Sequence, residues 1–96
     1  MHIRIVRTQM APEQVEEVAR RWAEFWPVRL CIQPGFQHAH FGIDRVTGAT
    51  VGVTVFAERP DDVLFERLSR KFRAMLDTSG LDQPPESTVY EITAEV

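Results

Sequence analysis

The chain has 96 residues, of which 44% are hydrophobic and 26% charged, and its formal net charge at pH 7 is −3. These values are typical of one globular domain spanning residues 1–96, which would bury only roughly 60 to 65% of its unfolded surface and would gain stability from a partner subunit. Because acidic and basic residues are interspersed and the balance is negative, neither nucleic acid nor an anionic membrane is an expected partner.

Residues 2–8 are predicted to form the first strand. Their side chains alternate, so that Ile3 and Ile5 share one face while His2 and Arg4 share the other. We expect the isoleucine face to lie under the helices, because it is the more apolar of the two.

A helix is predicted to begin at Pro12, since proline is tolerated at a first helical position and several acids follow it. Its apolar positions recur at helical spacing: Val15, Val18, Trp22, Phe25 and Trp26. Two ion pairs are expected on the opposite side: Glu16 with Arg20, and Glu17 with Arg21. Pro27 predicts a kink or a break, because it lacks the N–H of a helix hydrogen bond.

The middle of the chain is predicted to form a hairpin of strands 36–43 and 49–58, joined by a turn from Asp44 to Gly48. If Ile43 faces Ala49, one face of the hairpin is apolar, and we expect the helices to cover it: Ala39, Phe41, Ile43, Val51, Val53 and Val55. The reverse face then carries His38, His40, Gly42, Thr50, Gly52, Thr54 and Phe56. A slip of one residue would exchange the faces.

A second helix is predicted from Pro60 to just before Gly80, followed by a loop over residues 79–86. Its expected apolar stripe is Val63, Leu64, Leu68, Phe72, Met75 and Leu76. Residues 87–96 alternate as a last strand, with Tyr90 toward the helices and Val89 and Glu91 away from them.

The order βαββαβ predicts an α+β, ferredoxin-like fold, in which two helices cover one face of a four-stranded antiparallel sheet and the second and fourth strands are outermost. By the assignments above, the uncovered face mixes polar and apolar side chains. Such a face favours a homodimer, with a cavity between the two sheets.

With its Pro12 helix start, Pro34-Gly35-Phe36 ahead of the second strand and the Asp44 to Gly48 turn, the chain resembles the antibiotic biosynthesis monooxygenase-like proteins of the dimeric α+β barrel superfamily. The resemblance implies a homodimer of face-to-face sheets. Some members of this family oxygenate small aromatic substrates without metal or flavin, so the resemblance also implies this activity. Haem degradation, known in other members, is not expected, because those relatives use an Asn, Trp and His set and this chain contains no Asn.

His38 and His40 are the candidate catalytic residues, because side chains two apart on a strand point to the same side. An imidazole facing a cavity can act as a base toward a phenol or enol, whose anion then reacts with oxygen. The alternative is that both merely line the cavity. The candidate substrate-binding residues are Arg4, Phe56, Thr54, Glu91 and Trp22, although helical spacing alone would also place Trp22 in the core.

No metal site or cofactor is expected, since His-x-His supplies two ligands and no third ligand is fixed by spacing. The single cysteine, Cys31, excludes an intrachain disulfide and is expected to be buried. This cysteine content and the alternating start favour a cytoplasmic protein without a signal peptide.

Two functions remain open from the sequence. The first is a homodimeric, cofactor-independent monooxygenase acting on a small aromatic or polyketide-like compound. The alternative is a non-catalytic small-molecule-binding or interaction module with the same dimeric fold.

Overall fold

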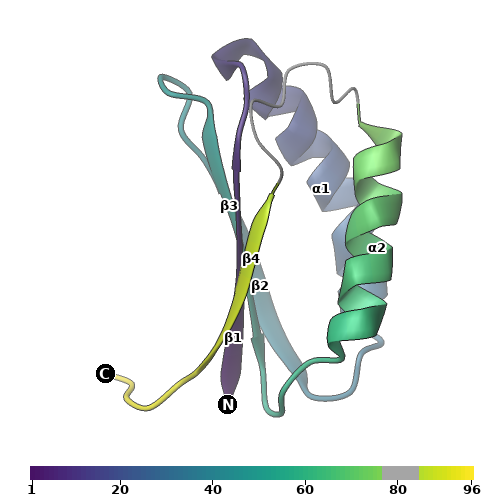
Figure 1. The fold of residues 1–96 in the computed structure, drawn as a ribbon, viewed down its shortest axis with the longest axis vertical. Helices are drawn as coiled ribbons and strands as arrows, with labels where there is room; N and C mark the ends of the chain where they lie inside the picture. The colour runs from purple at the N-terminus through teal and green to yellow at the C-terminus, as the bar shows by residue number, and fades with distance from the viewer. Residues whose placement is uncertain (77–84) are drawn as a thin grey trace.

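The computed structural model describes residues 1–76 and 85–96, which form a four-stranded antiparallel sheet with two helices on one face (Figure 1). The elements are β1 (His2–Gln9), the short 3-10 helix η1 (Pro12–Gln14), α1 (Val15–Leu30), β2 (Phe36–Ile43), β3 (Ala49–Phe56), α2 (Asp62–Met75) and β4 (Glu86–Glu91). The strand order is β2-β3-β1-β4, so the second and fourth strands are the edges. The predicted ferredoxin-like βαββαβ fold is therefore confirmed.

Two strands end earlier than predicted. β3 stops at Phe56, after which the Ala57 N–H donates to the Gly35 carbonyl at 2.7 Å. β4 stops at Glu91, opposite His2, after which the Ile92 N–H donates to the Met1 carbonyl at 2.9 Å.

The sequence predicted a kink or a break at Pro27, and the break is wrong. Helix α1 runs to Leu30, and the Cys31 N–H donates to the Pro27 carbonyl at 3.0 Å. Proline removes the partner of the Ala23 carbonyl, but both residues lie on the exposed side of the helix, where water can satisfy that oxygen.

The predicted ion pair between Glu16 and Arg20 does not form. The Glu16 carboxylate instead accepts a hydrogen bond from Arg45 in the turn between β2 and β3. Arg20 binds Glu17 and Glu24, on either side of it along the helix.

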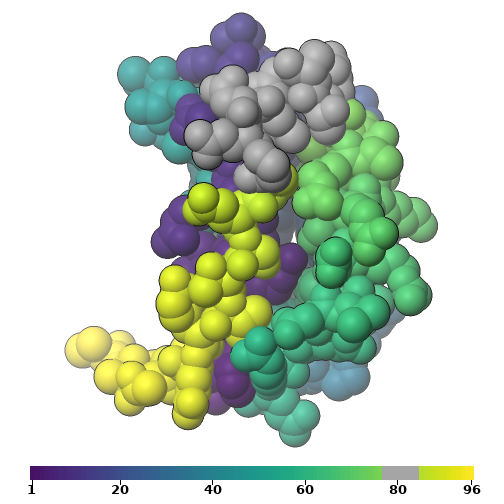
Figure 2. Space-filling view, viewed as in Figure 1, coloured from purple at the N-terminus to yellow at the C-terminus, as the bar shows by residue number. Residues whose placement is uncertain are grey.

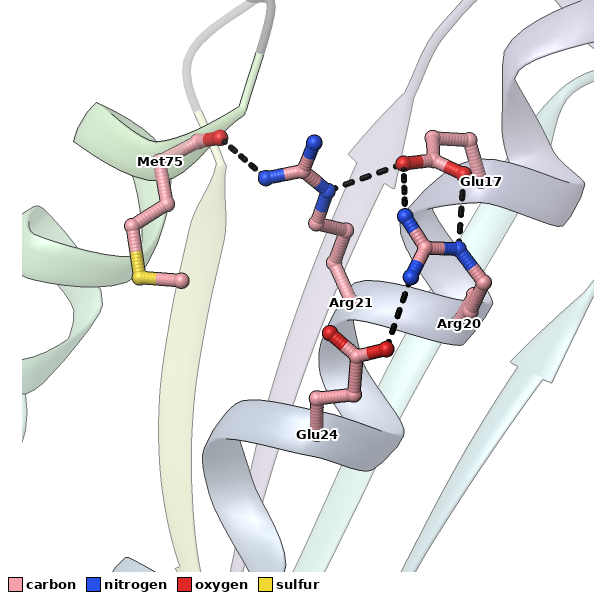
Figure 3. Close-up of polar contacts among 5 residues, drawn as sticks. All are labelled: Glu17, Arg20, Arg21, Glu24 and Met75. Atoms are coloured by element: carbon pink, nitrogen blue, oxygen red, sulfur yellow. Dashed lines mark hydrogen bonds and ion pairs between the residues drawn. The ribbon is translucent and has the colours of Figure 1, made fainter.

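The exposed charges of α1 also reach the end of α2 (Figure 3). Glu17 accepts from Arg20 at 2.5 Å and from Arg21 at 2.8 Å, and these hydrogen bonds lower the pKa of Glu17 to about 2. Arg21 in turn donates to the carbonyl of Met75 at 3.1 Å. The last turn of α2 is therefore held against α1.

Helix α2 starts at an Asp61 cap, whose carboxylate accepts from two backbone N–H groups at 3.0 and 3.1 Å. Its buried side chains are Phe65 and Phe72, whereas Val63 is 69% exposed and Met75 is 42% exposed. The predicted stripe was therefore rotated, and Val63 and Met75 were wrongly placed in the core. The expected stop at Gly80 lies outside the described residues.

An aromatic cluster joins both helices to one end of the sheet. Its members are Phe25, Trp26, Phe56, Phe65 and Phe72, each less than 9% exposed. The Phe56 and Phe65 ring centroids are 5.2 Å apart and those of Phe25 and Phe72 are also 5.2 Å apart. Burial of Phe25 and Trp26 confirms the predicted apolar face of α1 at this end.

The hairpin turn is one residue shorter than predicted. The Asp44 side chain accepts hydrogen bonds from two backbone N–H groups of the turn, at 2.9 and 3.2 Å, and the Asp44 N–H donates to the Ala49 carbonyl at 2.8 Å. Asp44 thus stays paired with Ala49, and Ile43 lies opposite Thr50. Because of this shift, the β3 side chains that were predicted to share a face with His38 and His40 lie on the opposite face of the sheet.

The helices cover a different sheet face from the predicted one on β1, β3 and β4. Arg4 contacts α2, and Phe41 stacks on Trp22 of α1, so their cross-strand partners also face the helices. The helix-covered strand residues include Arg4, Val6, Thr8, Ala39, Phe41, Thr50, Gly52, Thr54, Phe56 and Val89. The uncovered residues, here called the open face, include Ile3, Ile5, His38, His40, Val51, Val53, Val55 and Tyr90. The prediction held only for β2.

Gly48 closes the turn against the end of β1. Its φ is +82°, and its carbonyl accepts from the Met10 N–H at 3.0 Å. A Cβ at this position would lie 1.9 Å from the Met10 carbonyl oxygen, so only glycine fits.

Candidate functional site

A pocket of about 510 Å³ lies between the sheet and the helices. The predicted cavity between the sheets of two subunits stays a prediction, because the structure describes one chain. Figure 2 shows the surface hollowed between β4 and α2, which supply part of the wall of this pocket. Its volume falls in the range of small-molecule sites, about 300 to 1,000 Å³. The polar lining is Arg4, Thr8, Thr50, Thr54, Arg59, Asp62, Glu66, Ser69, Arg73 and Ser87, and the aromatic lining is Trp22, Trp26, Phe41 and Phe72.

Arg4 is the buried cation of this pocket, with 8% of its surface exposed. Its Nη2 donates to the Ser69 hydroxyl at 3.1 Å, and its Cζ lies 5.1 Å from the centroid of the Phe65 ring. Burial lowers the pKa of Arg4, while the Asp62 carboxylate acts in the opposite direction. An arginine remains protonated under such a shift, so the pocket keeps a positive charge.

A flat aromatic wall stands on the α1 side. The rings of Trp22 and Phe41 stack with centroids 5.3 Å apart and planes inclined by 22°. Gly52 lies beneath them, and a Cβ there would be 3.6 Å from the Trp22 Nε1 atom. The missing side chain lets the Trp22 and Phe41 rings approach the backbone of β3 closely at this wall of the pocket.

Hydroxyl groups line the floor of the pocket. Thr50 and Thr54 of β3 are 4% and 6% exposed, and the Thr8 and Thr50 hydroxyls are hydrogen-bonded to each other. Thr54 is the cross-strand neighbour of Arg4. Hydroxyl donors beside a guanidinium suit a ligand that carries oxygen atoms.

Five substrate-binding residues were predicted from the sequence, and three of them line this pocket: Arg4, Thr54 and Trp22. Phe56 is instead part of the aromatic core, with 1% of its surface exposed. Glu91 is exposed at the end of β4 and is not among the lining residues.

His38 and His40 lie on the open face, with their rings 5.5 Å apart. The prediction that they share a face with Arg4 is wrong, because the shorter turn pairs them with Val55 and Val53. Neither histidine lines the pocket. Their catalytic role stays a prediction. It was based on a sheet face shared with Arg4, and the structure does not show that shared face.

Sequence reasoning missed Ser69, which binds Arg4. The signal was present, since Ser69 follows Phe65 by four positions and precedes Phe72 by three, so a polar residue occupies the buried side of α2. Trp26 was not among the predicted substrate-binding residues, yet it lines the pocket as well as the core.

Three further features concern residues 1–76 and 85–96 alone. They contain no cluster of three or more His, Cys, Asp or Glu side chains placed to hold a metal ion. None of their helices has the length and apolar character needed to cross a membrane. Cys31 is exposed, so its predicted burial is wrong.

Comparison of the sequence with protein-family models and with curated proteins finds no match. The fold, however, matches solved structures along nearly the whole chain. A monooxygenase from the gene ActVA-Orf6 of Streptomyces coelicolor, solved in complex with nanaomycin D, is 14% identical with a TM-score of 0.76, and the match covers 99% of this chain and 89% of that one.

Two other matches have related descriptions. An antibiotic biosynthesis monooxygenase is 13% identical with a TM-score of 0.68, over 98% of this chain and 100% of that one. SnoaB, a cofactor-independent oxygenase from Streptomyces nogalater, is 20% identical with a TM-score of 0.59, over 99% and 95% of the two chains. At these identities the likeness is one of fold, and at that level it confirms the resemblance inferred from the sequence.

Proposed function

We propose that the protein is a homodimeric, cofactor-independent monooxygenase, and that its small aromatic or polyketide-like substrate occupies the pocket between sheet and helices. The observation that carries the proposal is the pocket itself: about 510 Å³, walled by aromatic rings and holding one buried guanidinium. Its fold is shared with proteins described as monooxygenases, one of them cofactor-independent.

The proposed chemistry uses the acidity of the substrate. A phenol or an activated methylene loses a proton, and Arg4 stabilises the anion in a partly desolvated site. Asp62 and Glu66 are the carboxylates of the lining that can accept this proton. The anion reduces O2: the methylene carbon loses two hydrogens and becomes a carbonyl that holds one oxygen atom, the other oxygen leaves with those hydrogens as water, and all four electrons come from the substrate. No external reductant is then needed.

An oxygen-uptake assay tests this proposal. Anthrone suits it, because its methylene is acidified by the carbonyl group and two rings and is converted to a second carbonyl with release of one water. We expect uptake above the spontaneous rate, incorporation of ¹⁸O from ¹⁸O2, and a loss of about 100- to 1,000-fold in turnover for Arg4→Met, the range of an electrostatic contribution to a transition state. Uptake equal to the protein-free rate for anthrone and for hydroxylated naphthalenes would reject the reaction.

The non-catalytic binding module remains the second candidate, and one observation favours it. No histidine is among the described lining residues, and the two carboxylate residues among them, Asp62 and Glu66, are exposed. A protein that binds these aromatic compounds but consumes no oxygen with any of them would belong to this class.

The homodimer is proposed from the character of the open face. Ile3, Ile5, Val51 and Val53 are only partly covered, and Tyr90 is 49% exposed, so apolar side chains from three strands share one surface. Contiguous apolar surfaces of this kind mark association sites. A second sheet packed face to face would cover them.

Two matched substitutions test the dimer. Val53→Asp adds a charge to the open face, whereas Val63→Asp adds the same charge to an exposed position of α2. In light scattering after size exclusion, we expect the wild type and Val63→Asp to be dimers and Val53→Asp to be a monomer. A monomeric wild type at micromolar concentration would reject the dimer.

A further inference from the structure

Among the described residues that line the pocket, the balance of charge is positive. Three arginines line it, Arg4, Arg59 and Arg73, against two carboxylates, Asp62 and Glu66. The chain as a whole has a formal net charge of −3. A concave site of locally positive potential on an acidic protein concentrates anions and excludes cations.

Arg4, the buried arginine of the three, forms no ion pair among the described residues, and the Asp62 carboxylate acts on it only through its charge. Asp62 is bound by Arg59 at 3.1 Å, near the surface. Among the described residues, Arg4 is bonded only to the neutral Ser69 hydroxyl and lies over the ring of Phe65. A buried cation in such surroundings is costly to desolvate, and an anionic ligand would offset that cost.

We propose that Arg4 anchors a planar oxyanion of the ligand, either a carboxylate or the conjugate base of a phenol or enol, with the aromatic body of the ligand against Trp22 and Trp26. This inference rests on the proposed function in so far as the pocket is the substrate site, and it adds the charge of the substrate. Ser69 and the Phe65 ring hold the guanidinium in place, and the other N–H groups of Arg4 form no hydrogen bond within residues 1–76 and 85–96.

The geometry favours a planar anion over a phosphate. A guanidinium fork matches the two oxygens of a carboxylate, or one enolate oxygen with a neighbouring carbonyl. A phosphate needs several donors around a tetrahedral group, and Arg4 is the only buried cation among the described residues. The Trp22 and Phe41 stack also suits a flat ring system next to the anion.

Nuclear magnetic resonance can report binding directly, because the chain contains two tryptophans and both line the pocket. The wild type labelled with ¹⁵N is titrated with 2-naphthoate, with its neutral isostere 2-naphthamide, and with 2-naphthol below and above the pH at which the naphthol ionises. We expect both indole N–H signals to shift, and 2-naphthoate to bind about 10- to 100-fold more tightly than the amide, as for one hydrogen bond to a charged group. Tighter binding of naphthol only when ionised identifies the phenolate as an accepted anion as well.

Variants assign this preference to Arg4. Arg4→Met should bind the acid and the amide equally, Arg4→Lys should keep part of the preference, and Arg67→Met on the exposed side of α2 should behave as the wild type. The comparison of acid and amide on the wild type needs no variant, so it decides the question even if Arg4→Met does not fold.

Each outcome has a defined meaning. Equal affinity of the wild type for acid and amide, or an unchanged preference in a folded Arg4→Met, overturns the anchor while leaving the proposed reaction open to its own assay. Indole signals that respond to none of the probes overturn both proposals. Preferential binding of 2-naphthoate without oxygen uptake for any substrate supports the anchor and rejects the reaction.

Discussion

The contact between Arg4 and Phe65 links the pocket to the core, and its strength can be measured. The Cζ of Arg4 lies 5.1 Å from the ring centroid, while the two residues are 8% and 2% exposed. We consider Arg4→Met, which keeps the length of the side chain, Phe65→Leu, which keeps an apolar side chain, and the double variant. The double-mutant cycle isolates the interaction between the two side chains.

The expected coupling is about 1 to 2 kcal/mol, because a cation over an aromatic ring contributes about 0.5 to 1 kcal/mol at exposed sites and about 2 when desolvated. Phe65→Leu also loses ring contacts to Phe56 and Trp26, so alone it should cost more, about 1 to 3 kcal/mol. Arg4→Met loses the hydrogen bond to Ser69 but also removes a buried charge, and these effects oppose each other. Arg4→Met alone should therefore change the free energy of unfolding only slightly.

Urea unfolding followed by circular dichroism gives the four free energies, at one protein concentration because a dimer makes stability depend on concentration. The control cycle pairs Phe65→Leu with Arg67→Met, whose exposed side chain should behave additively. A coupling between Arg4 and Phe65 within about 0.5 kcal/mol of zero, the usual error of additivity, would refute the contact as a source of stability.

Three other predictions follow from particular residues. Gly52→Val should leave the thermal midpoint within a few degrees of wild type but weaken 2-naphthoate binding by about 10-fold or more in the same titration, because its branches enter the pocket; unchanged binding would move the ligand elsewhere. The pKa of Glu17 is about 2 in the folded protein against an ordinary 4.5, so the stabilisation by its ion pairs is complete above pH 4.5 and is lost as the pH falls toward 2. Between these two pH values, the thermal midpoint should therefore fall less steeply for Glu17→Gln than for the wild type. Parallel curves for the two proteins would contradict the ion pairs. Replacement of both His38 and His40 by Ala should leave ligand affinity and turnover unchanged, and a loss of turnover would restore the catalytic role once assigned to them.

The order of the elements could be predicted because each is encoded locally. Period-two alternation marks β1, acidic starts mark both helices, and Pro34-Gly35 precedes β2. The assignment of faces could not be made in this way. A polarity pattern ranks the face of Ile3 and Ile5 as the one to be covered, whereas the helices cover the face of Arg4 and Thr54, where a pocket requires polar side chains.

The hairpin register failed for a separate reason. The pairing of β2 with β3 depends on whether Asp44 belongs to the turn or to the strand. In the structure, Asp44 pairs with Ala49 through its backbone, while its side chain accepts hydrogen bonds from the turn. The site was therefore predicted in part. Arg4, Thr54 and Trp22 were chosen as ligand contacts and do meet, but on the opposite side of the sheet from His38 and His40.

Gly48 has a consequence for how the chain folds. Its left-handed conformation completes the turn between β2 and β3, and its carbonyl also binds the N–H of Met10, where β1 leads into the first helical turn. The local event of turn closure and the long-range event of docking the N-terminal strand therefore depend on the same residue. A side chain at this position would penalise both steps at once, so the hairpin and β1 should assemble in a single cooperative transition.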